Sequence, residues 1–373
     1  MEGWRDMSRS SALMAPAMTT ERLPIVDCVS PEPRARGREH GEALRLPIRE
    51  KIERWQSATA ADYGEAPSSF FERLLKETGF RAAIERHTPE LMEEVLGIAE
   101  GAGIDPETAY AMQLMDEEWW FGRAAHDGHC SGAAIAPSGR DVTAMGQTMD
   151  LPAWHDGAQA LLKLRGKNGT PSLVFTSAGM IGLMGFSGRG LGICVNTLSG
   201  LRSRPDGLPV AFVMRGALAR ESATDAKRFL VGVPHASGQN YLIGDRWNVF
   251  ALECSAAGAR EVAAQNGRIL HTNHPLVSLD LRTDAAASEN SKARLSSLHA
   301  ELCDAQGRTV ENIKAALASR REGAAISMER RPDMGQTQLM SIGAVVYEIG
   351  GAIRGWVTGG PPSAGAWREL SFG

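Results

Sequence analysis

The periodicity of apolar residues changes near residue 130, and this change constrains the fold more than any other feature of the sequence. Before it, apolar residues recur at helical spacing, as in the stretches 38–55 and 70–84. After it, short runs of strand-forming residues alternate with turn residues. Helices followed by strands, and then by further helices and strands, favour antiparallel sheets with helices packed on them. We therefore expect an α+β fold and not a doubly wound α/β fold.

Two helices in the first part have a marked start, because a capping residue stands directly before proline. These capping residues are Thr88 and Asp105, whose side chains are suited to accept a hydrogen bond from the first turn. The first helix is predicted to end near Gly101, and the second to extend toward the tryptophan pair at 119–120. We expect the tryptophan pair to pack in the core.

The second part is predicted to contain several hairpins. Strands are expected at 131–137, 142–149, 160–164, 172–177, 190–196, 240–243, 249–254, 339–349 and 352–358, and helices at 209–220, 225–229, 290–302 and 310–319. The run GRGLG at 188–192 has its third glycine one residue early for a dinucleotide-binding loop, and no helix start follows it. We interpret this run as a turn that leads into the next strand.

Composition and charge exclude several classes of protein. The length of 373 residues fits one large or two fused domains, and 43% hydrophobic with 23% charged residues is typical of a folded globular protein. Forty basic against 44 acidic residues give a net charge of -4, which provides no basic field for nucleic acid. No apolar run approaches the roughly 20 residues of a membrane helix, and no signal peptide is readable. We expect neither nucleic acid nor a membrane as a partner.

The cysteines point to a reducing, cytoplasmic environment. Their number is odd, they are widely spaced and no two form a CxxC pair, so neither a disulfide framework nor a zinc knuckle is expected. The five are Cys28, Cys130, Cys194, Cys254 and Cys303.

Cys130 stands where the helical part gives way to strands, and two roles are open to it. It is either a buried packing residue or a new chain terminus, produced by cleavage of the peptide bond that precedes it. In the second case the thiol is a nucleophile, and the freed α-amino group, with an ordinary pKa near 8, is the base that activates it.

Four other segments, taken together with Cys130, resemble a known enzyme family. They are GREHG at 37–41, GQTMD at 146–150, GLGICVN at 190–196 and HTNHP at 271–275. In this order and spacing they resemble the acyl-coenzyme A:6-aminopenicillanic acid acyltransferases, also called isopenicillin N acyltransferases, within the N-terminal-nucleophile hydrolases. The chain is more distantly similar to penicillin V acylases and bile salt hydrolases.

The resemblance implies a four-layer αββα sandwich, made as a precursor that cleaves itself between His129 and Cys130. Many family members have glycine where this chain has His129. Cleavage would divide the chain into a helical N-terminal segment, 1–129, and a catalytic domain, 130–373. The two parts would remain associated as an αβ heterodimer, which could also form a higher oligomer. The implied activity is that of an amidohydrolase or acyltransferase that acts on a small-molecule amide through a thioester acyl-enzyme. No cofactor is implied, although acyl-coenzyme A could serve as a co-substrate.

The resemblance also implies roles for four residues besides Cys130. Asp150 matches the aspartate that contacts the amino group of the nucleophile, and Asn273 matches an amide donor that faces the developing oxyanion. Asn196 matches a second such donor in the bile salt hydrolase branch. Arg294 matches a substrate-binding arginine that supplies charge near the nucleophile. From the residues alone, Asp150 could instead be a turn residue at a strand end, Asn196 a strand cap, and Arg294 part of an exposed helix face.

Two other classes of function stay open. A metal-dependent hydrolase could use His and Cys ligands, and a non-catalytic binding protein could have the same fold. Against the metal, adjacent residues 129 and 130 would point to opposite faces of a strand, and no glutamate stands next to either histidine of the later segment. The candidate ligands are His126, His129, Cys130, His271 and His274.

Overall fold

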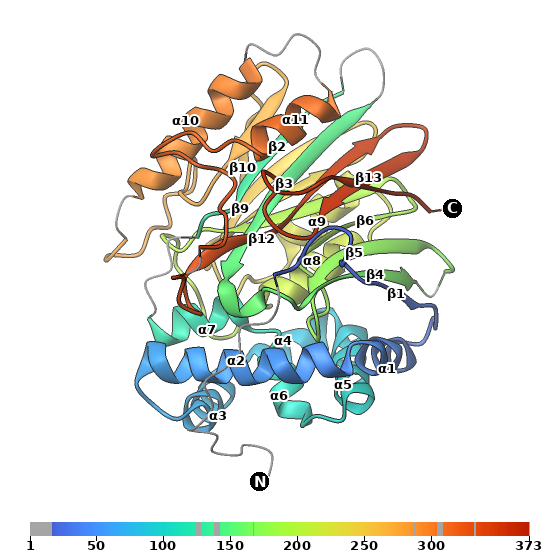
Figure 1. The fold of residues 1–373 in the computed structure, drawn as a ribbon, viewed down its shortest axis with the longest axis vertical. Coiled ribbons are helices and arrows are strands. Elements are labelled where there is room, and N and C mark those ends of the chain that lie inside the picture. Colours follow the sequence, from blue (N-terminus) through green and yellow to red (C-terminus); the bar gives the residue numbers. More distant parts are fainter. Residues whose placement is uncertain are drawn as a thin grey trace.

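Two β-sheets face each other at the centre of the molecule, with helices on their outer faces (Figure 1). The computed structural model describes residues 17–123, 128–137, 142–166, 168–285, 288–303, 309–331 and 333–372. The expected α+β class and its four-layer αββα arrangement are confirmed. A set of N-terminal helices lies at one end of the sandwich, at the bottom of the view in Figure 1.

The larger sheet has eight strands in the order β1-β4-β5-β6-β7-β8-β9-β10. Neighbouring strands are antiparallel, except that β1 from the N-terminal part pairs in parallel with β4. The strands are β1 (Ile25–Cys28), β4 (Gln159–Arg165), β5 (Pro171–Ser177), β6 (Met184–Ser187), β7 (Leu191–Thr197), β8 (Gln239–Gly244), β9 (Val249–Ser255) and β10 (Gly258–Val262).

The smaller sheet has six antiparallel strands in the order β11-β2-β3-β12-β13-β14. Two of the predicted hairpins form here, β2–β3 and β12–β13, and a third, β8–β9, forms in the larger sheet. The strands are β2 (Ser131–Ile135), β3 (Thr143–Pro152), β11 (Arg268–His271), β12 (Leu339–Ile349), β13 (Ile353–Thr358) and β14 (Arg368–Leu370). The predicted turn at 138–139 lies outside the described residues.

The two sheets pack face to face through large apolar side chains. The rings of Phe186 on β6 and Tyr347 on β12 are 5.1 Å apart. Both residues belong to a continuous buried core that includes residues of the two sheets and of the N-terminal helices. Burial of apolar surface between the layers is the main source of stability for such a sandwich.

Four helices cover the outer faces of the sheets. The helices α8 (Val210–Leu218) and α9 (Ala223–Gly232) pack on the larger sheet, and α10 (Glu289–Cys303) and α11 (Val310–Leu317) pack on the smaller one. The ends of all four helices lie within three residues of the ends predicted for them.

The N-terminal helices form at the predicted places, but they are more numerous and shorter than expected. The single helix expected at 38–55 is interrupted at Leu44, where α1 ends and α2 begins. Pro47 lies in the first turn of α2, and its ring has no N–H to donate to the carbonyl of Ala43, so one continuous helix cannot form. The helices are α1 (Pro33–Ala43), α2 (Arg45–Tyr63), α3 (Pro67–Glu77), α4 (Phe80–His87), α5 (Pro89–Ala102), α6 (Pro106–Ala111) and α7 (Met115–Gly122).

Two further helix predictions need correction. The hydroxyl of Thr88 makes no capping hydrogen bond, and α5 ends at Gly103, whose φ of 64° is left-handed, and not at Gly101. Asp105 does cap α6, since its carboxylate accepts a hydrogen bond from the Thr108 backbone N–H at 2.9 Å. This helix is shorter than predicted, and beyond its end the side chain of Gln113 donates to the carbonyl of Ala109 at 2.8 Å.

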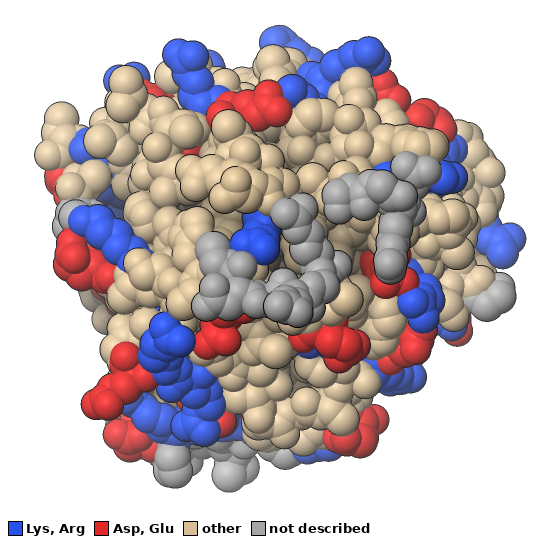
Figure 2. Space-filling view, turned by 90° about the horizontal axis from the view of Figure 1, so that it is seen from above, with Lys and Arg blue, Asp and Glu red and all other residues tan. Residues whose placement is uncertain are grey.

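The surface carries charges of both signs. On the face shown in Figure 2, Lys and Arg side chains lie among Asp and Glu side chains, with no large area of one sign. In the part of the chain that the structure describes, no helix combines the length and apolar character needed to cross a lipid bilayer.

Candidate active site

Cys130 lies directly before β2, and its thiol points into a cavity. The side chain is 4% exposed. Because Ser131 pairs with Thr148 in the β2–β3 hairpin, Cys130 comes to lie opposite the end of β3. The backbone N–H of Asp150 donates to its Sγ at 3.4 Å. Burial raises the pKa of the Cys130 thiol, so the nucleophile needs a base or a nearby cation to ionise.

The cavity at Cys130 is mostly apolar and has a volume of about 30 Å³. Its walls come from β3, β7, the start of α8 and the segment before α7. Four methionines give it a deformable surface that suits an apolar group of variable shape. The apolar walls are formed by Met115, Met149, Leu151, Met180, Leu183, Val195, Val210, Ala211 and Met214, and the polar side chains by Gln113, Asp116, Thr197 and Gln239.

Asp150 lies inside β3 and is 1% exposed, so its alternative role as a turn residue is wrong. Its Oδ2 accepts a hydrogen bond from the hydroxyl of Thr148 at 3.2 Å, and Ser341 on the neighbouring strand also bonds to the carboxyl group. Among the described residues, Oδ1 has no hydrogen-bond partner. Burial raises the pKa of Asp150 to about 7, against an ordinary value of 3.8.

Arg294 is completely buried, so its alternative role on an exposed helix face is wrong. It extends from α10 toward the smaller sheet, and its Nη1 donates to the carbonyl oxygen of His129 at 2.6 Å and to that of Cys130 at 2.9 Å. The same nitrogen donates to Oγ of Ser131 at 2.8 Å. The positively charged guanidinium group of Arg294 is therefore hydrogen-bonded to the peptide carbonyl oxygens on both sides of Cys130.

Asn273 is oriented by Arg294. Its Oδ1 accepts a hydrogen bond from Nη2 of Arg294 at 3.0 Å, so its Nδ2 must point the other way, where it donates to the carbonyl of Thr197 at 2.9 Å. The backbone N–H of Asn273 donates to Oγ of Ser291 at 2.8 Å. The side chain is thus held as a fixed hydrogen-bond donor against Thr197, which is a residue of the cavity wall.

Asn196 is buried near the end of β7, where it bonds to the segment that carries Asn273. Its Nδ2 donates to the carbonyl of Thr272, and its Oδ1 accepts from Nδ2 of Asn240 at 2.9 Å. No hydrogen bond recorded among the described residues joins Asn196 to Cys130. In this intact chain the side chain holds Thr272 in place.

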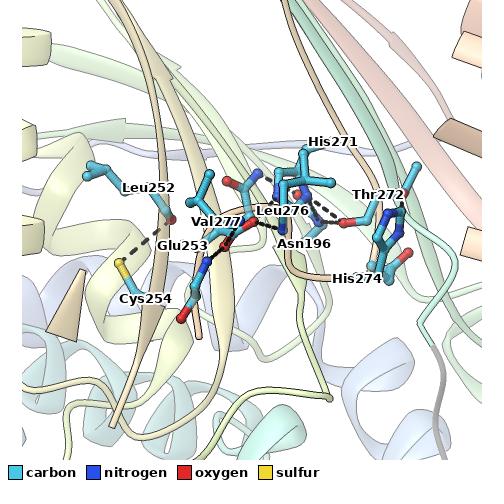
Figure 3. A network of polar contacts seen from close by, with 12 residues as sticks. Asn196, Leu252, Glu253, Cys254, His271, Thr272, His274, Leu276 and Val277 are labelled. Carbon is cyan, nitrogen blue, oxygen red and sulfur yellow. Dashed lines mark hydrogen bonds and ion pairs between the residues drawn. The ribbon is translucent and has the colours of Figure 1, made fainter. Parts of the chain in front are cut away.

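A buried ion pair supports the same segment (Figure 3). Nε2 of His271 lies 2.9 Å from Oε1 of Glu253, and Nδ1 of His271 lies 2.7 Å from the carbonyl oxygen of Thr272. Glu253 also accepts hydrogen bonds from the backbone N–H groups of 276–278. Burial alone would raise the pKa of Glu253, but the hydrogen bonds from His271 and from these amides outweigh it and lower the pKa.

The histidines proposed as metal ligands are engaged in other contacts. Both ring nitrogens of His271 already lie within hydrogen-bond distance of protein oxygens, since Nε2 lies near the carboxylate of Glu253 and Nδ1 near the carbonyl of Thr272. Nδ1 of His274 lies 2.8 Å from Oγ of Ser291. Within the described ranges, no three side chains of His, Cys, Asp or Glu come together in a way that could hold a metal. His126 lies outside those ranges.

Several residues of the site were missed from the sequence. Ser131 and Thr148 adjoin residues that had been recognised, so their positions next to Cys130 and Asp150 offered a signal. Asn290 and Ser291 lie three or four residues before Arg294 on the same helix, so they offered a similar signal. Asp116 and Glu253 offered none, because they come from separate segments. Asn290 accepts a hydrogen bond from Nε of Arg294 at 2.8 Å, and Asp116 accepts from Gln239 at 2.8 Å in the wall of the cavity.

Comparisons with known proteins identify relatives of this chain. The family model described as acyl-coenzyme A:6-aminopenicillanic acid acyl-transferase matches residues 138–348. A relative from Emericella nidulans, the 40 kDa form of acyl-coenzyme A:6-aminopenicillanic-acid-acyltransferase, is 28% identical over 247 residues, which are 65% of this chain and 66% of that protein. The alignment thus spans slightly less than two thirds of the relative.

Two solved structures match more than half of this chain at a low level of similarity. A Caenorhabditis elegans orthologue of N-acylethanolamine-hydrolyzing acid amidase matches with a TM-score of 0.41 and 13% identity, over 58% of this chain and 92% of that one. A mutant conjugated bile acid hydrolase from Clostridium perfringens matches with a TM-score of 0.36 and 12% identity, over 65% of this chain and 97% of that one. Because the family model covers more than half of its residues, this chain belongs to the acyl-coenzyme A:6-aminopenicillanic acid acyltransferase family.

Proposed function

We propose that this protein is a self-cleaving N-terminal-cysteine amidohydrolase or acyltransferase that acts on a small-molecule amide. The cut falls between His129 and Cys130 and divides the chain into 1–129 and 130–373, which remain associated as a heterodimer. Acyl-coenzyme A could serve as a co-substrate in the acyltransferase reaction. The free cysteines support a reducing, cytoplasmic setting.

One observation carries the proposal: Nη1 of Arg294 donates to the carbonyl oxygen of His129 at 2.6 Å. This carbonyl belongs to the peptide bond that must be cut. A buried guanidinium on its oxygen draws electrons from the carbonyl carbon and stabilises the negative charge that forms on oxygen during attack.

Self-cleavage then proceeds in two steps, formation of a thioester and its hydrolysis. Sγ of Cys130 attacks the carbonyl carbon of His129, and the C–N bond breaks while the nitrogen of Cys130 takes up the proton that the thiol has lost. The product is a thioester between His129 and the thiol, with a free α-amino group on Cys130. Water hydrolyses the thioester, which leaves a carboxylate on His129 and restores the thiol.

The base for the first step cannot be the α-amino group, since it does not exist before cleavage. We propose Asp150 for this role. Its pKa of about 7 allows the carboxylate both to accept a proton and to release it near neutral pH. After cleavage, the new ammonium group would be a cation close to Asp150, whose pKa would fall, and the carboxylate would then hold the amino group in position.

Substrate turnover uses the same nucleophile. The apolar cavity beside Cys130 suits the acyl part of an amide. The thiol attacks the amide carbonyl, the amine leaves with a proton from the α-ammonium group, and a thioester acyl-enzyme results. Water then yields a carboxylic acid, or an acceptor amine yields a new amide. Asn273 is proposed to donate to the oxyanion from its Nδ2, while Asn196 holds Thr272 and thereby Asn273.

The proposal is tested by examining freshly purified protein on denaturing gels and by mass spectrometry. We expect chains of 129 and 244 residues, of about 14 and 26 kDa in proportion to the 40.0 kDa total, and an N-terminal sequence of the larger chain that begins at Cys130. The cleaved protein is then assayed with short acyl amides and penicillins. Cys130→Ala should abolish both cleavage and turnover.

Cys254→Ala is the matched control, because Cys254 is also buried but lies outside the cavity. It should cleave and turn over substrate like the unaltered protein. An intact chain that hydrolyses amides would contradict the terminal-amine mechanism, and turnover by the Cys130→Ala variant would show that the nucleophile is a different residue.

A further inference from the structure

A second cavity, larger than the one at Cys130, lies between α1, α5, α8 and the ends of β4, β5 and β6. It has a volume of about 280 Å³ and shares no lining residue with the cavity at Cys130. The two cavities lie along α8, whose first half lines the cavity at Cys130 and whose second half lines this one. Its lining includes Arg36, Glu90, Arg165, Ser187, Arg189 and Arg215.

The side chains that line this cavity carry an excess of positive charge. Four of the lining residues are arginines, and Glu90 is the single acidic one among those described. Two of the arginines, Arg36 and Arg215, are buried and share one carboxylate, that of Glu94, at 2.6 and 2.8 Å. Two guanidinium groups against one carboxylate leave one positive charge uncompensated in a buried place, and a charge in that position is unfavourable without a counterion.

The hydroxyl of Ser187 provides a second, independent observation. Ser187 is the last residue of β6, lines the cavity and is 2% exposed, yet its Oγ has no hydrogen-bond partner among the described residues. A buried hydroxyl without a partner costs free energy of folding. A ligand oxygen in the cavity would satisfy it.

Arg189 supplies a third donor from another direction. It belongs to the glycine-rich turn at 188–192, which the structure confirms as a turn between β6 and β7, with Gly190 in a left-handed conformation at φ 80°. Nε of Arg189 donates to the hydroxyl of Thr170 at 3.1 Å, and Nη1 pairs with the exposed carboxylate of Glu221. These contacts hold the guanidinium in the cavity wall.

We propose that this cavity is a binding site for a small molecule that carries a phosphate monoester. Arg36 and Arg215 contribute charge, because their N–H groups already donate to Glu94 and to backbone carbonyls. Ser187 and Arg189 contribute donors from the end of β6 and from the turn after it. A tetrahedral phosphate can accept hydrogen bonds from several directions, whereas a carboxylate offers its two oxygens in one plane. The dianionic charge also matches the excess of positive charge. The site stands independently of the reaction proposed at Cys130.

The test is isothermal titration calorimetry of the full protein with inorganic phosphate, glycerol phosphate and succinate as separate probes. Ionic strength is held constant, since exposed arginines also attract anions weakly. We expect saturable binding of both phosphates with a Kd of about 1 mM or below, and weaker binding of succinate. Arg189→Gln should raise the Kd about tenfold or more, and Ser187→Ala by a smaller factor, because a charged donor contributes more than a neutral one.

Arg354→Gln is the matched control, because it removes an arginine of a surface ion pair outside the cavity. It should leave the Kd unchanged. The proposal would be overturned if binding did not saturate up to about 20 mM phosphate or if Arg189→Gln left the Kd unchanged. It would also be overturned if Arg189→Gln and Arg354→Gln lost affinity for phosphate equally. Tighter binding of succinate than of phosphate would overturn the assignment of the ligand class. Ser187→Ala removes a hydroxyl without a partner and is expected to fold.

Discussion

At the scale of single residues, the site depends on a buried carboxyl group and on an amide, each held beside Cys130 by its neighbours. Asp150 and Asn273 differ in what they can do. A carboxyl group can exchange a proton and change its charge, whereas an amide remains neutral and can only donate or accept a hydrogen bond. Their substitutions should therefore have different signatures in the dependence of rate on pH.

For Asp150, we predict a pH-dependent rate of self-cleavage. The carboxyl group, with its pKa raised to about 7 by burial, is protonated below that pH and becomes a base above it. The cleavage rate of protein refolded from denaturant should therefore rise with pH and level off above about 7. Asp150→Asn should lose this inflection and slow cleavage by about 100-fold or more, as followed by densitometry of denaturing gels.

Glu117→Gln is the control for this assignment. Burial, together with the neighbouring Asp116, raises the pKa of Glu117 to about 8, but the residue does not line the cavity at Cys130. Its substitution should leave the inflection in place. An inflection that survives in Asp150→Asn and disappears in Glu117→Gln would reverse the assignment.

For Asn273, we predict a lower rate without a displaced pH profile. Asn273→Ala removes a neutral donor that Arg294 orients, and loss of one oxyanion donor costs about 100- to 1000-fold in kcat. The pH dependence of kcat/KM should keep its shape, because no titrating group is removed. The measurement must use fully cleaved protein, and a profile displaced along the pH axis would show that Asn273 acts through a proton transfer.

At the scale of elements, α1 and α5 cross at a distance that only glycine permits. A Cβ atom at Gly97 would lie 2.1 Å from the carbonyl oxygen of Arg34, which is a backbone atom that cannot rotate away. The crossing brings Glu94 of α5 against Arg36 of α1 and so forms one side of the cavity with excess positive charge.

Gly97→Ala should therefore destabilise the fold, by about 1–3 kcal/mol as for other overpacked sites, even though alanine is the better helix former. Gly232 at the end of α9 is the matched control, since a Cβ there meets nothing within 4 Å. Gly232→Ala should be neutral or stabilising by up to about 1 kcal/mol. Urea unfolding monitored by circular dichroism gives both values, and equal effects would show that the helix crossing can relax.

At the scale of the whole molecule, Glu94 connects the N-terminal helices to the sandwich. It pairs with Arg36 of α1 and with Arg215 of α8, which packs on the larger sheet. Burial by itself would raise the pKa of Glu94, but the two guanidinium groups outweigh it and lower the pKa from 4.5 to about 2. A carboxyl group whose pKa is lower in the folded state contributes stability that is present above its unfolded pKa.

We therefore predict that this contribution is complete above about pH 4.5 and is lost as the pH falls toward 2. Glu94→Gln should destabilise the protein at neutral pH by about 3–5 kcal/mol, because it leaves two buried guanidinium groups without a carboxylate. The difference in free energy of unfolding between the two proteins should shrink between pH 4.5 and 2. A constant difference across that range would mean that Glu94 does not carry the charge assigned to it.

The sequence by itself determined the features that depend on neighbouring residues. The change of periodicity near residue 130 predicted the α+β class, and alternation around turn residues predicted the hairpins β2–β3, β8–β9 and β12–β13. The position of Asp105 directly before a proline predicted the cap of the helix that follows it. The motif segments brought Cys130 and Asp150 to attention, and the hairpin places them together because pairing between adjacent strands is a local outcome.

Only the tertiary structure decided the features that depend on distant parts of the chain. The short strands β1, β6, β10, β11 and β14 were not predicted, because a strand of three to five residues carries little periodicity and is stabilised by its partners in the sheet. The family resemblance placed Arg294 near the nucleophile, but from the residues alone an exposed helix face explained it nearly as well. Its burial against the carbonyl of His129, 165 residues away in the chain, follows from the packing of α10 on the smaller sheet. No local pattern encodes such a contact, since its energy comes from groups that only the folded core brings together.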